Sequence, residues 1–508
     1  MTRFKKIVCI PRFRYGLRVA LGFLLAGAIA NAPAAFGQVA KTPAEKFVLE
    51  HLKIKGEADL EESPLKENER VLRHEFLEEL ITSTHPNAAI VAYGINISNV
   101  TVHGQLNVNN ATIAFPLRFA KCKFEGGIDF SYDKFAHDLS LDHSVIGMKD
   151  MNANTSSALF LGMKVEDALN LHGTYFYSTV NFTYAEIGSE LLSDEVHYES
   201  PEDADFDSLK AKAPVFFRKC HFAGKLNLSD GDLFSLQLEG SLPLGQNSSD
   251  PLGNIDLEIN QAQIRHGFEV KNVALSRLQA GFVDMEGPTD LENVVPVGHV
   301  DLNHSHFQDL TITGFDQWLQ RGVKTRDFRL EGLTFDGIEL PQYQVEPSAI
   351  RMLALIDSSP YSPQPYLELE RYLRAHGNPD EADDVYIDMR RRGRAQLYFL
   401  QRPFDLMLDL LVGYGRRPWR SGLAALLLIL VGALIFRRQC MEHDDEKCSD
   451  EWYNPFWFSL DLLSPIDLGV SKRWRAKDYR LRNYAQVHRV AGWILIPLIA
   501  AAITGIIK

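Results

Sequence analysis

Cysteine is scarce in this chain, with five residues among 508, and basic residues (53 Lys and Arg) are outnumbered by acidic ones (66 Asp and Glu). So few cysteines exclude a small disulfide scaffold. The net charge of −13 argues against a nucleic-acid partner, because neutralising phosphates requires a surplus of basic residues. The sequence also lacks G-x-S-x-G, H-E-x-x-H, G-x-G-x-x-G and Gly-Lys-Ser/Thr motifs. We therefore expect neither a catalytic residue set nor a bound cofactor.

The acidic surplus is concentrated in the middle of the chain. Residues 1–40 contain six basic residues and no acidic one, and 351–508 contain 22 basic and 19 acidic residues. Residues 41–350 contain 25 basic and 47 acidic residues, a net charge of −22. Three parts of different chemistry are therefore predicted.

The N-terminal part has the order of an export signal. Basic residues end at Arg18, an apolar run extends from Val19 to Ala30, and small residues follow. This order predicts a signal peptide or an N-terminal anchor over residues 1–37.

Two apolar, uncharged runs lie near the C-terminus and predict transmembrane spans over about 420–437 and 490–507. Two buried core helices are the alternative. Segment 452–470, between the runs, is aromatic and apolar, and predicts an interfacial helix or a re-entrant segment. The residues expected to anchor the spans in lipid are Arg416, Arg417, Trp419, Arg420, Arg437, Arg438 and Trp493.

The orientation follows from the basic residues. Loop 437–489 contains ten of them, which favours the cytoplasmic side, although the cluster at 416–420 argues for the opposite orientation. We expect a multi-pass membrane protein, with the middle part on the extracytoplasmic side.

An internal repeat dominates the middle part. Large apolar residues are spaced alternately five and six residues apart, with a second apolar or small residue two positions before most of them. The i, i+2 pairs and the abundant Asn and Gly indicate short strands with corners, and argue against a right-handed helical supercoil. A parallel β-solenoid of about 22 residues per coil is predicted over 89–345, with a loop insert near 190–213. The first series of large residues is Ile97, Val102, Val108, Ile113, Phe119, Phe124, Phe130, Phe135, Leu141 and Ile146.

The spacing resembles that of degenerate pentapeptide-repeat proteins, which form a right-handed, quadrilateral β-helix. Residues 41–508 resemble a bacterial family of membrane-anchored proteins built on such a solenoid. The similar motifs are RHEFLEELI at 73–81, GYGRRPWR at 413–420 and FSLDLLSPIDLG at 458–469. The resemblance implies a protein of a bacterial inner (plasma) membrane, with the extracytoplasmic solenoid in the periplasm and mostly unassigned function, and some members carry an oxidoreductase label.

Helices are predicted on both sides of the solenoid. Thr42, Pro43 and Glu45 form an N-terminal helix signal that opens a helical cap over 41–88. Asn378-Pro379 separates the arms of a helical hairpin within 348–412, which ends in a juxtamembrane helix. The membrane module takes up 413–508.

Few residues are candidates for chemistry. Cys440, His443 and Cys448 could bind a metal or act in redox chemistry, although their spacing fits no standard zinc pattern. His304 and His306 are a second weak metal candidate, and a polar solenoid surface is the alternative. Cys122 and Cys220 occupy the same slot of the repeat and are expected to fill the core. The letters VGYG at 412–415 match a potassium filter, but they precede the first span, so an interfacial anchor is expected.

The favoured function is that of a non-catalytic scaffold, a membrane-tethered β-solenoid that binds a protein partner through its acidic surface. Membrane lipid is the other expected partner, and nucleic acid is not. The alternatives are an oligomeric transport or channel accessory protein, which requires a homo-oligomer, and a membrane-associated redox protein that uses Cys440 and Cys448.

Overall fold

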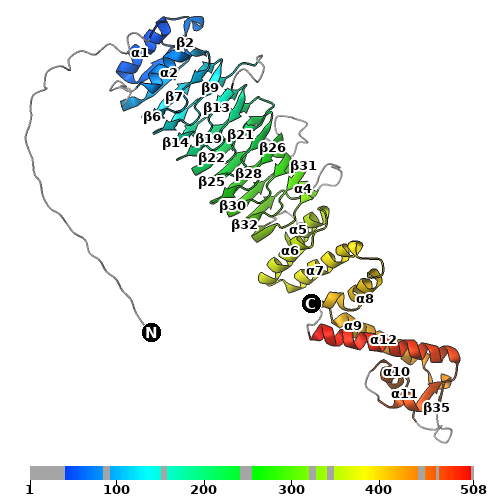
Figure 1. Cartoon of the computed structure of the whole chain (residues 1–508). Helices are drawn as coiled ribbons and strands as arrows, with labels where there is room; N and C mark the ends of the chain where they lie inside the picture. The colour runs from blue at the N-terminus through cyan, green and yellow to red at the C-terminus, as the bar shows by residue number, and fades with distance from the viewer. Residues whose placement is uncertain are drawn as a thin grey trace, which may run out of the picture.

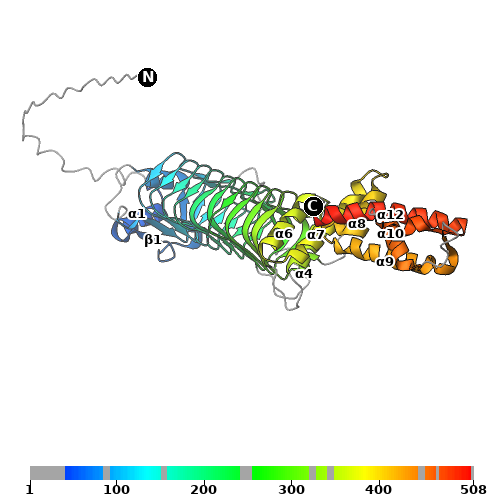
Figure 2. The ribbon, with the colours of Figure 1, turned by 90° about the horizontal axis from the view of Figure 1, so that it is seen from below.

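The chain is an elongated rod of parallel β-sheet with helices at both ends (Figures 1 and 2). The computed structural model describes residues 40–83, 92–149, 157–240, 254–319, 328–339, 348–443, 452–464 and 468–504. The predicted signal at 1–37 lies outside these residues.

In the described residues, the middle of the rod consists of three stacked parallel sheets with 17, 10 and 7 strands. The first sheet contains β1 (Glu57–Asp59), β3 (Ile95–Ser98), β6 (Thr112–Ile113), β7 (Leu117–Ala120), β10 (Lys134–Phe135), β11 (Leu139–Ser140), β14 (Lys164–Val165), β15 (Leu169–Asn170), β18 (Glu186–Ile187), β19 (Leu191–Asp194), β22 (Lys210–Arg218), β25 (Asp232–Glu239), β27 (Gln263–Ile264), β28 (Phe268–Lys271), β30 (Asp284–Glu292), β32 (His306–Thr313) and β34 (Thr334–Glu339). The second contains β2 (Val71–Arg73), β4 (Thr101–His103), β8 (Lys123–Phe124), β12 (Val145–Ile146), β16 (Tyr175–Phe176), β20 (His197–Tyr198) and β23 (His221–Phe222). The third contains β5 (Leu106–Asn107), β9 (Gly127–Asp129), β13 (Ser157–Leu159), β17 (Thr179–Asn181), β21 (Ala204–Asp205), β24 (Lys225–Asn227), β26 (Asn254–Glu258), β29 (Ala274–Gln279), β31 (Val295–Asp301) and β33 (Phe328–Arg329).

Strand register shows the repeat directly. Ile95 pairs with Leu117, and Leu117 with Leu139, which is a step of 22 residues per coil. Leu139 then pairs with Leu169, a step of 30, because an insertion lies between these two coils. The prediction of a mainly β chain with parallel strands in stacked sheets is confirmed.

The loop insert predicted near 190–213 is wrong. This stretch contains β19, β20, β21 and the start of β22, all paired in parallel with strands of neighbouring coils. The repeat was hidden there because several inward positions hold small residues, such as Ser193 and Ala204, which are buried. The acidic residues of the stretch lie on the outside of the coil.

Stacked aromatic rings fill part of the core. The ring of Phe182 stacks on those of Phe160 and Phe206, with centroids 4.2 and 4.7 Å apart. Tyr198 stacks in the same way on Phe222 at 4.8 Å. These separations match the spacing of neighbouring strands, so residues at equivalent positions of successive coils form continuous ladders.

Left-handed residues turn the corners between strands. Positive φ values recur twice per 22-residue coil, eleven residues apart, as at Asn99, Asn110 and Lys121. A side chain larger than that of glycine is disfavoured in this region of backbone space. At three corners, the ring of a left-handed residue lies over a glycine of the next coil, with Tyr132 over Gly162, His143 over Gly173 and His304 over Gly332.

The N-terminal end of the rod is closed by helices α1 (Pro43–Lys55) and α2 (His74–Thr82). The predicted helix start is confirmed, since the Thr42 hydroxyl accepts from the Glu45 N–H and the Glu45 carboxylate accepts from the Thr42 N–H. Glu45 is buried and also accepts a hydrogen bond from Arg73 at 2.8 Å, which ties α1 to the end of β2.

The other end of the solenoid is covered by α4 (Asp316–Leu319), α5 (Ser348–Ser358), α6 (Pro363–Ala375) and α7 (Pro379–Gly393). The last long strand, β34, would otherwise expose its edge. Arg371 and Tyr372 of α6 donate hydrogen bonds to the carbonyl oxygens of Phe335 and Ile338. Helices α6 and α7 form the hairpin that the Asn-Pro signal predicted.

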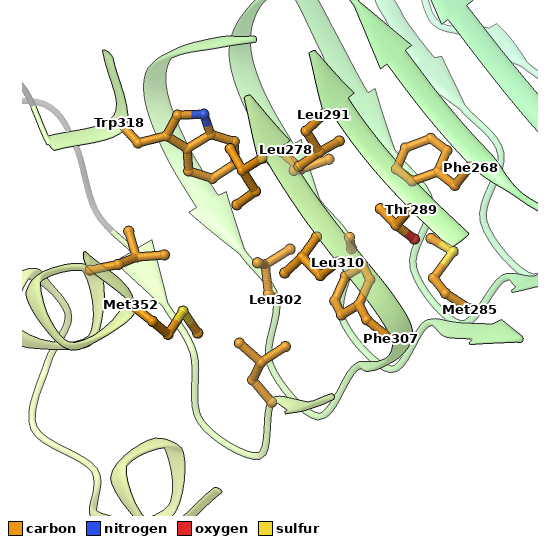
Figure 3. A pocket seen from close by; sticks show the side chains of 14 residues that line it. Phe268, Leu278, Met285, Thr289, Leu291, Leu302, Phe307, Leu310, Trp318 and Met352 are labelled. Atoms are coloured by element: carbon orange, nitrogen blue, oxygen red, sulfur yellow. The ribbon is translucent and has the colours of Figure 1, made fainter. Parts of the chain in front are cut away.

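A small cavity lies in the core where the last coils meet α5 (Figure 3). Its volume is about 20 Å³, enough for one water molecule. Thr289 lines it in a column of inward residues, between Phe268 and Leu310 of the neighbouring coils. The Thr289 hydroxyl is buried and forms no hydrogen bond with any of the described residues.

Replacing Thr289 with valine is therefore expected to stabilise the last coils by about 1 kcal/mol, because the shape is kept and a buried unpaired hydroxyl is removed. Hydrogen exchange of β30 and β32 in the full chain measures this. Thr313→Val, at an exposed position of β32, serves as the control and should change little. A loss of stability in Thr289→Val would mean that the hydroxyl is satisfied by an ordered water.

Where the structure describes it, the C-terminal part consists of further helices and one antiparallel strand pair, β35 (Met441–His443) with β36 (Trp474–Ala476). Its helical elements are η4 (Arg394–Gln396), α8 (Arg402–Val412), η5 (Gly413–Gly415), α9 (Trp419–Ile435), η6 (Arg438–Cys440), α10 (Pro455–Leu463), α11 (Val470–Arg473) and α12 (Tyr479–Ile503).

Within the described residues, no single helix combines the length and apolar character needed to cross a bilayer. One bent pair does so by length and composition, namely Arg402–Gly415 with Trp419–Ile435, whose axes differ by 118°.

Candidate functional sites

The clearest surface feature of the solenoid is a set of exposed carboxylates near its C-terminal end, which α4 to α7 cover. Strand β30 alternates buried and exposed residues along its whole length, and four of its five exposed residues are acidic. The neighbouring strands β32 and β34 add three more. We call this set the acidic strip, which consists of Asp284, Glu286, Asp290, Glu292, Asp309, Asp336 and Glu339.

Little positive charge balances this strip. The Lys271 ammonium lies 3.6 Å from the Glu292 carboxylate, and the Arg371 guanidinium lies 3.8 Å from the Asp336 carboxylate. Asp284, Asp290 and Asp309 form no ion pair with any residue in the described part of the chain. Like charges on adjacent strands repel one another, so a basic partner would relieve this repulsion.

The predicted metal candidates His304 and His306 lie on different structural features. His304 is a left-handed corner residue whose ring stacks on Phe282, with centroids 4.9 Å apart. His306 begins β32, and its Nδ1 lies 3.1 Å from the Thr334 hydroxyl. Neither belongs to a cluster of three metal-ligating side chains in the described residues.

The second predicted candidate set can be followed only in part. Cys440 is half-buried at the end of η6, and the ring of His443 packs edge-on against Trp474 at 4.9 Å. Cys448 lies outside the described residues, so the proposed pairing of Cys440 with Cys448 stays a prediction.

The solenoid cysteines are inward-facing and inert. The Cys122 thiol donates to the Ile97 carbonyl oxygen at 3.4 Å, and the Cys220 thiol donates to the Ser193 carbonyl oxygen at 2.8 Å. Burial raises the pKa of both thiols to about 12. Because the thiolate is the reactive form, neither residue is suited to redox work.

The basic cluster at 416–420, around the start of α9, binds carboxylate and carbonyl oxygens of the protein. Arg416 binds Glu370 of α6 and lies over the Tyr386 ring at 4.3 Å. Arg417 pairs with Asp384 of α7. Arg420 donates to the Asp409 carbonyl oxygen at 3.4 Å. These arginines therefore connect the hairpin to α8 and α9, and their role as lipid anchors stays a prediction.

Of the other predicted anchors, Trp419 begins α9, Arg437 and Arg438 follow its end, and Trp493 lies in the middle of α12. Trp419 and Trp493 are 63% and 66% exposed. Arg438 packs over the Trp474 ring at 4.0 Å, and Arg437 is exposed.

The VGYG letters form a structural turn. Tyr414 in η5 has a φ of 54° and a buried ring. Its hydroxyl donates to Asp405 at 2.7 Å and accepts from Arg394 at 2.8 Å. Burial, together with the bond to Asp405, raises the pKa of Tyr414 to about 12, so this hydroxyl stays protonated.

Asp409 is the other carboxylate at the centre of this ionic network, which we call the linker network (Arg391, Arg394, Asp405, Asp409 and Tyr414). It accepts from Arg391 at 3.0 Å and from Arg394 at 2.7 Å. Burial alone would raise the pKa of Asp409, but the hydrogen bonds from the two arginines outweigh burial and hold it below its ordinary value. The network fixes α8 against the end of the hairpin.

Large apolar side chains are exposed along α8, α9 and α12. A surface of this extent is unusual for a protein that meets only water. We call these residues the apolar face, which consists of Phe404, Leu406, Leu410, Leu423, Leu426, Leu427, Leu430, Val431, Leu434, Val487, Val490, Trp493 and Ile494.

Helix α10 packs closely against both α9 and α12. A Cβ on Gly432 of α9 would lie 2.1 Å from the Ser459 hydroxyl, and one on Gly492 of α12 would lie 2.0 Å from the Leu463 carbonyl oxygen. Ser459 is fully buried and lies 3.1 Å from Nε2 of His488. The predicted segment 452–470 thus contains a nine-residue helix held between two longer ones.

One cluster was not predicted. Ligand atoms of Asp142, His143 and His172 lie within 4.8 Å of one another. The repeat did not reveal this cluster. Asp142 and His172 are separated by a coil of 30 residues, and a constant 22-residue period would not align them.

Comparisons with known proteins do not identify the chain: no family model, curated protein or solved structure matches it.

Proposed function

We propose that this chain is a non-catalytic scaffold, tethered to a bacterial inner membrane, that binds a basic protein partner through the acidic strip. The observation that carries this proposal is the pairing of a largely uncompensated acidic strip on the solenoid with the apolar face on α8, α9 and α12. The acidic strip is suited to a soluble, cation-rich partner, and the apolar face is suited to lipid. Both lie in one chain and near the same end of the rod.

The apolar face supports the membrane part of the proposal. Helix α9 has 17 residues, about 26 Å at 1.5 Å per residue, which is short for a hydrocarbon core of about 30 Å. Amphipathic α8 directs Asp405 and Asp409 into the linker network and exposes Phe404 and Leu410. We propose that α8 lies in the interface, while α9 and the apolar part of α12 cross the bilayer.

The ion pairs of Arg416 and Arg417 bear on orientation. Their charges are already compensated by Glu370 and Asp384, so they weigh little in the positive-inside balance. Segment 437–489, which runs from the end of α9 into the first part of α12, keeps a basic surplus that includes Arg437 and Arg489. This favours a cytoplasmic loop and a periplasmic solenoid.

We also propose that the coils wind right-handed, as in the four-sided β-helix of pentapeptide-repeat proteins, and that the chain is related to the membrane-anchored family it resembles. Four strand positions per 22-residue coil support this, for example β7, β8, β9 and β10 in succession.

Reconstitution tests the proposal. The purified chain in vesicles of phosphatidylethanolamine and phosphatidylglycerol should float with the vesicles and retain a basic protein from a periplasmic extract at low salt. Reversing Asp284, Glu286, Asp290 and Glu292 to lysine should leave flotation intact and reduce partner recovery at least about tenfold. Raising the salt should weaken wild-type recovery, because the contact is electrostatic.

Two controls separate the parts of the proposal. Reversing four exposed acids of the N-terminal cap (Glu61, Glu62, Glu67 and Glu69) changes the charge equally and should leave recovery unchanged. Leu427→Arg with Leu430→Arg should abolish flotation, whereas Ile54→Arg, at an exposed apolar position of α1, should not. Equal recovery by both reversal variants would refute the scaffold role, and flotation of the double arginine variant would refute the tether.

A second candidate is the oligomeric channel or transport accessory role, favoured by the close packing of α10 between α9 and α12. Copies of the chain would then cover part of the apolar face. A defined oligomer in mild detergent together with ion conductance in planar bilayers would support it, and a monomer would rule it out. The redox alternative rests on Cys440 and Cys448 alone.

A further inference from the structure

We propose that Asp142, His143 and His172 form a solvent-facing binding site for a borderline divalent transition ion such as Zn²⁺. The three residues come from two successive coils at one corner of the solenoid, where β11 and β15 pair in parallel. Extending that register by two residues places Asp142 opposite His172. The proposal is independent of the membrane and scaffold roles.

The ligand types match the ion. Two imidazoles and one carboxylate are a common three-ligand set for zinc, in which the remaining position is left open. The Nδ1 of His143 lies 3.1 Å from the Asp142 carboxylate, and the rings of His143 and His172 meet edge-on with centroids 4.8 Å apart. Ligand atoms around a tetrahedral zinc lie about 3.4 Å apart. With ligand atoms within 4.8 Å of one another, side-chain rotation alone could close the set around one ion.

The backbone holds the two histidines together. The His143 N–H donates to the His172 carbonyl oxygen at 2.7 Å. His143 has a φ of 48°, and this turns the chain at the corner. A Cβ on Gly173 would lie 2.9 Å from the His143 ring. Glycine at 173 therefore leaves the space that the His143 ring occupies beside His172.

The next residue in the column is not available as a fourth ligand. Asp194, one coil beyond His172, accepts two hydrogen bonds from Arg218 at 2.7 and 2.8 Å. The protein thus supplies three ligands. The open position would accept water or a donor from a bound partner.

Metal titration of the full chain in detergent tests the site. After removal of metal with a chelator, Zn²⁺ should bind with a Kd in the micromolar range. His172→Asn and His143→Asn should each weaken this binding by at least about tenfold. Gly173→Ala should weaken it as well, because the added Cβ displaces the His143 ring. With Co²⁺, the wild type should show the intense visible bands of a low-symmetry site, and His172→Asn should lose them.

His137→Asn is the matched control, because His137 is an exposed histidine that also contacts a coil-adjacent carboxylate, Asp167, at 3.2 Å. It should bind Zn²⁺ as the wild type does. Far-ultraviolet circular dichroism of each variant establishes that the solenoid is retained. The proposal is overturned if the wild type binds no Zn²⁺ at 100 µM, a concentration of about 100 times the expected Kd, or if His172→Asn and the wild type titrate alike.

Discussion

Replacing Asp133 with asparagine is expected to stabilise the solenoid at pH 8 by about 2–4 kcal/mol, which is an unusual result for a change at a fully buried polar residue. Asp133 is 0% exposed. Its equivalents in neighbouring coils are Ala111, Met163 and Ala185, as the pairing of the adjacent strands shows. A carboxyl therefore stands where the repeat otherwise places an apolar side chain.

The hydrogen bonding of Asp133 explains why asparagine should be tolerated. One carboxylate oxygen accepts from the Ala111 N–H at 2.6 Å, and the other has no hydrogen-bond partner among the described residues. Asparagine keeps the acceptor and removes the buried negative charge. Burial, with a smaller contribution from the charge of Asp129, raises the pKa of Asp133 from 3.8 to about 7.

The raised pKa also predicts a pH dependence. Between about pH 4 and pH 7 the folded state keeps the Asp133 proton that the unfolded state has lost, so stability falls as the pH rises through this window. The full effect at higher pH is about 4 kcal/mol. Asp133→Asn should remove this dependence and should match the wild type near pH 4.

Urea unfolding and hydrogen exchange of β6, β10 and β14 at pH 4.5 and pH 8 measure both effects. Asp284→Asn removes an exposed carboxyl and should leave the pH profile of these strands unchanged. Equal destabilisation by Asp133→Asn at both pH values would show that Asp133 is ionised and satisfied in the fold, contrary to the prediction.

The architecture could be predicted because it depends on one local rule. Inward residues spaced five and six apart, such as Phe119, Phe124 and Phe130, are all buried as expected. The rule failed at 190–213, where the step between coils is 24 residues and the inward residues Ser193 and Ala204 are small. It could not anticipate Asp133, since a periodic pattern does not reveal which position departs from it.

The candidate sites were less predictable because they depend on contacts between distant segments. The acidic strip was expected only as a general acidic surface, since its location requires the outward residues of β30, β32 and β34 to be aligned by register. The cluster at Asp142 and His172 depends on the 30-residue coil. The ion pairs of Arg416 and Arg417 could not be predicted, because nothing in the sequence connects these residues with Glu370 and Asp384.

Asp409→Asn is expected to release α8 from the helical hairpin, with a loss of about 2–3 kcal/mol in the stability of that contact. The variant leaves Arg391 and Arg394 beside a neutral amide. Removing one charge of a buried ion pair lowers stability, because the remaining charge is left uncompensated. We expect a smaller loss of stability than for a fully buried ion pair, because the Arg391 side chain is 47% exposed and water partly screens its charge.

The linker network gives this prediction a matched control on the same arginine. Asp388 lies 3.5 Å from Arg391, but burial raises the pKa of Asp388, which means that its charge is already disfavoured in the fold. Asp388→Asn removes the same charge and should leave stability unchanged or slightly higher. Opposite outcomes at two carboxylates of one arginine would locate the stabilisation in Asp409.

The pH dependence of Asp409 is the reverse of that of Asp133. Because its pKa is lowered below the ordinary value of 3.8, Asp409 contributes stability above that pH, and the contribution is lost as the pH falls through the lowered value. Hydrogen exchange of α8 in detergent should therefore show faster exchange in Asp409→Asn at pH 7 and a shrinking difference below pH 4. Unchanged exchange at pH 7 would show that α8 is held by its contacts with α9 and not by the linker network. In that case the linker network would not be what connects the solenoid to the apolar helices.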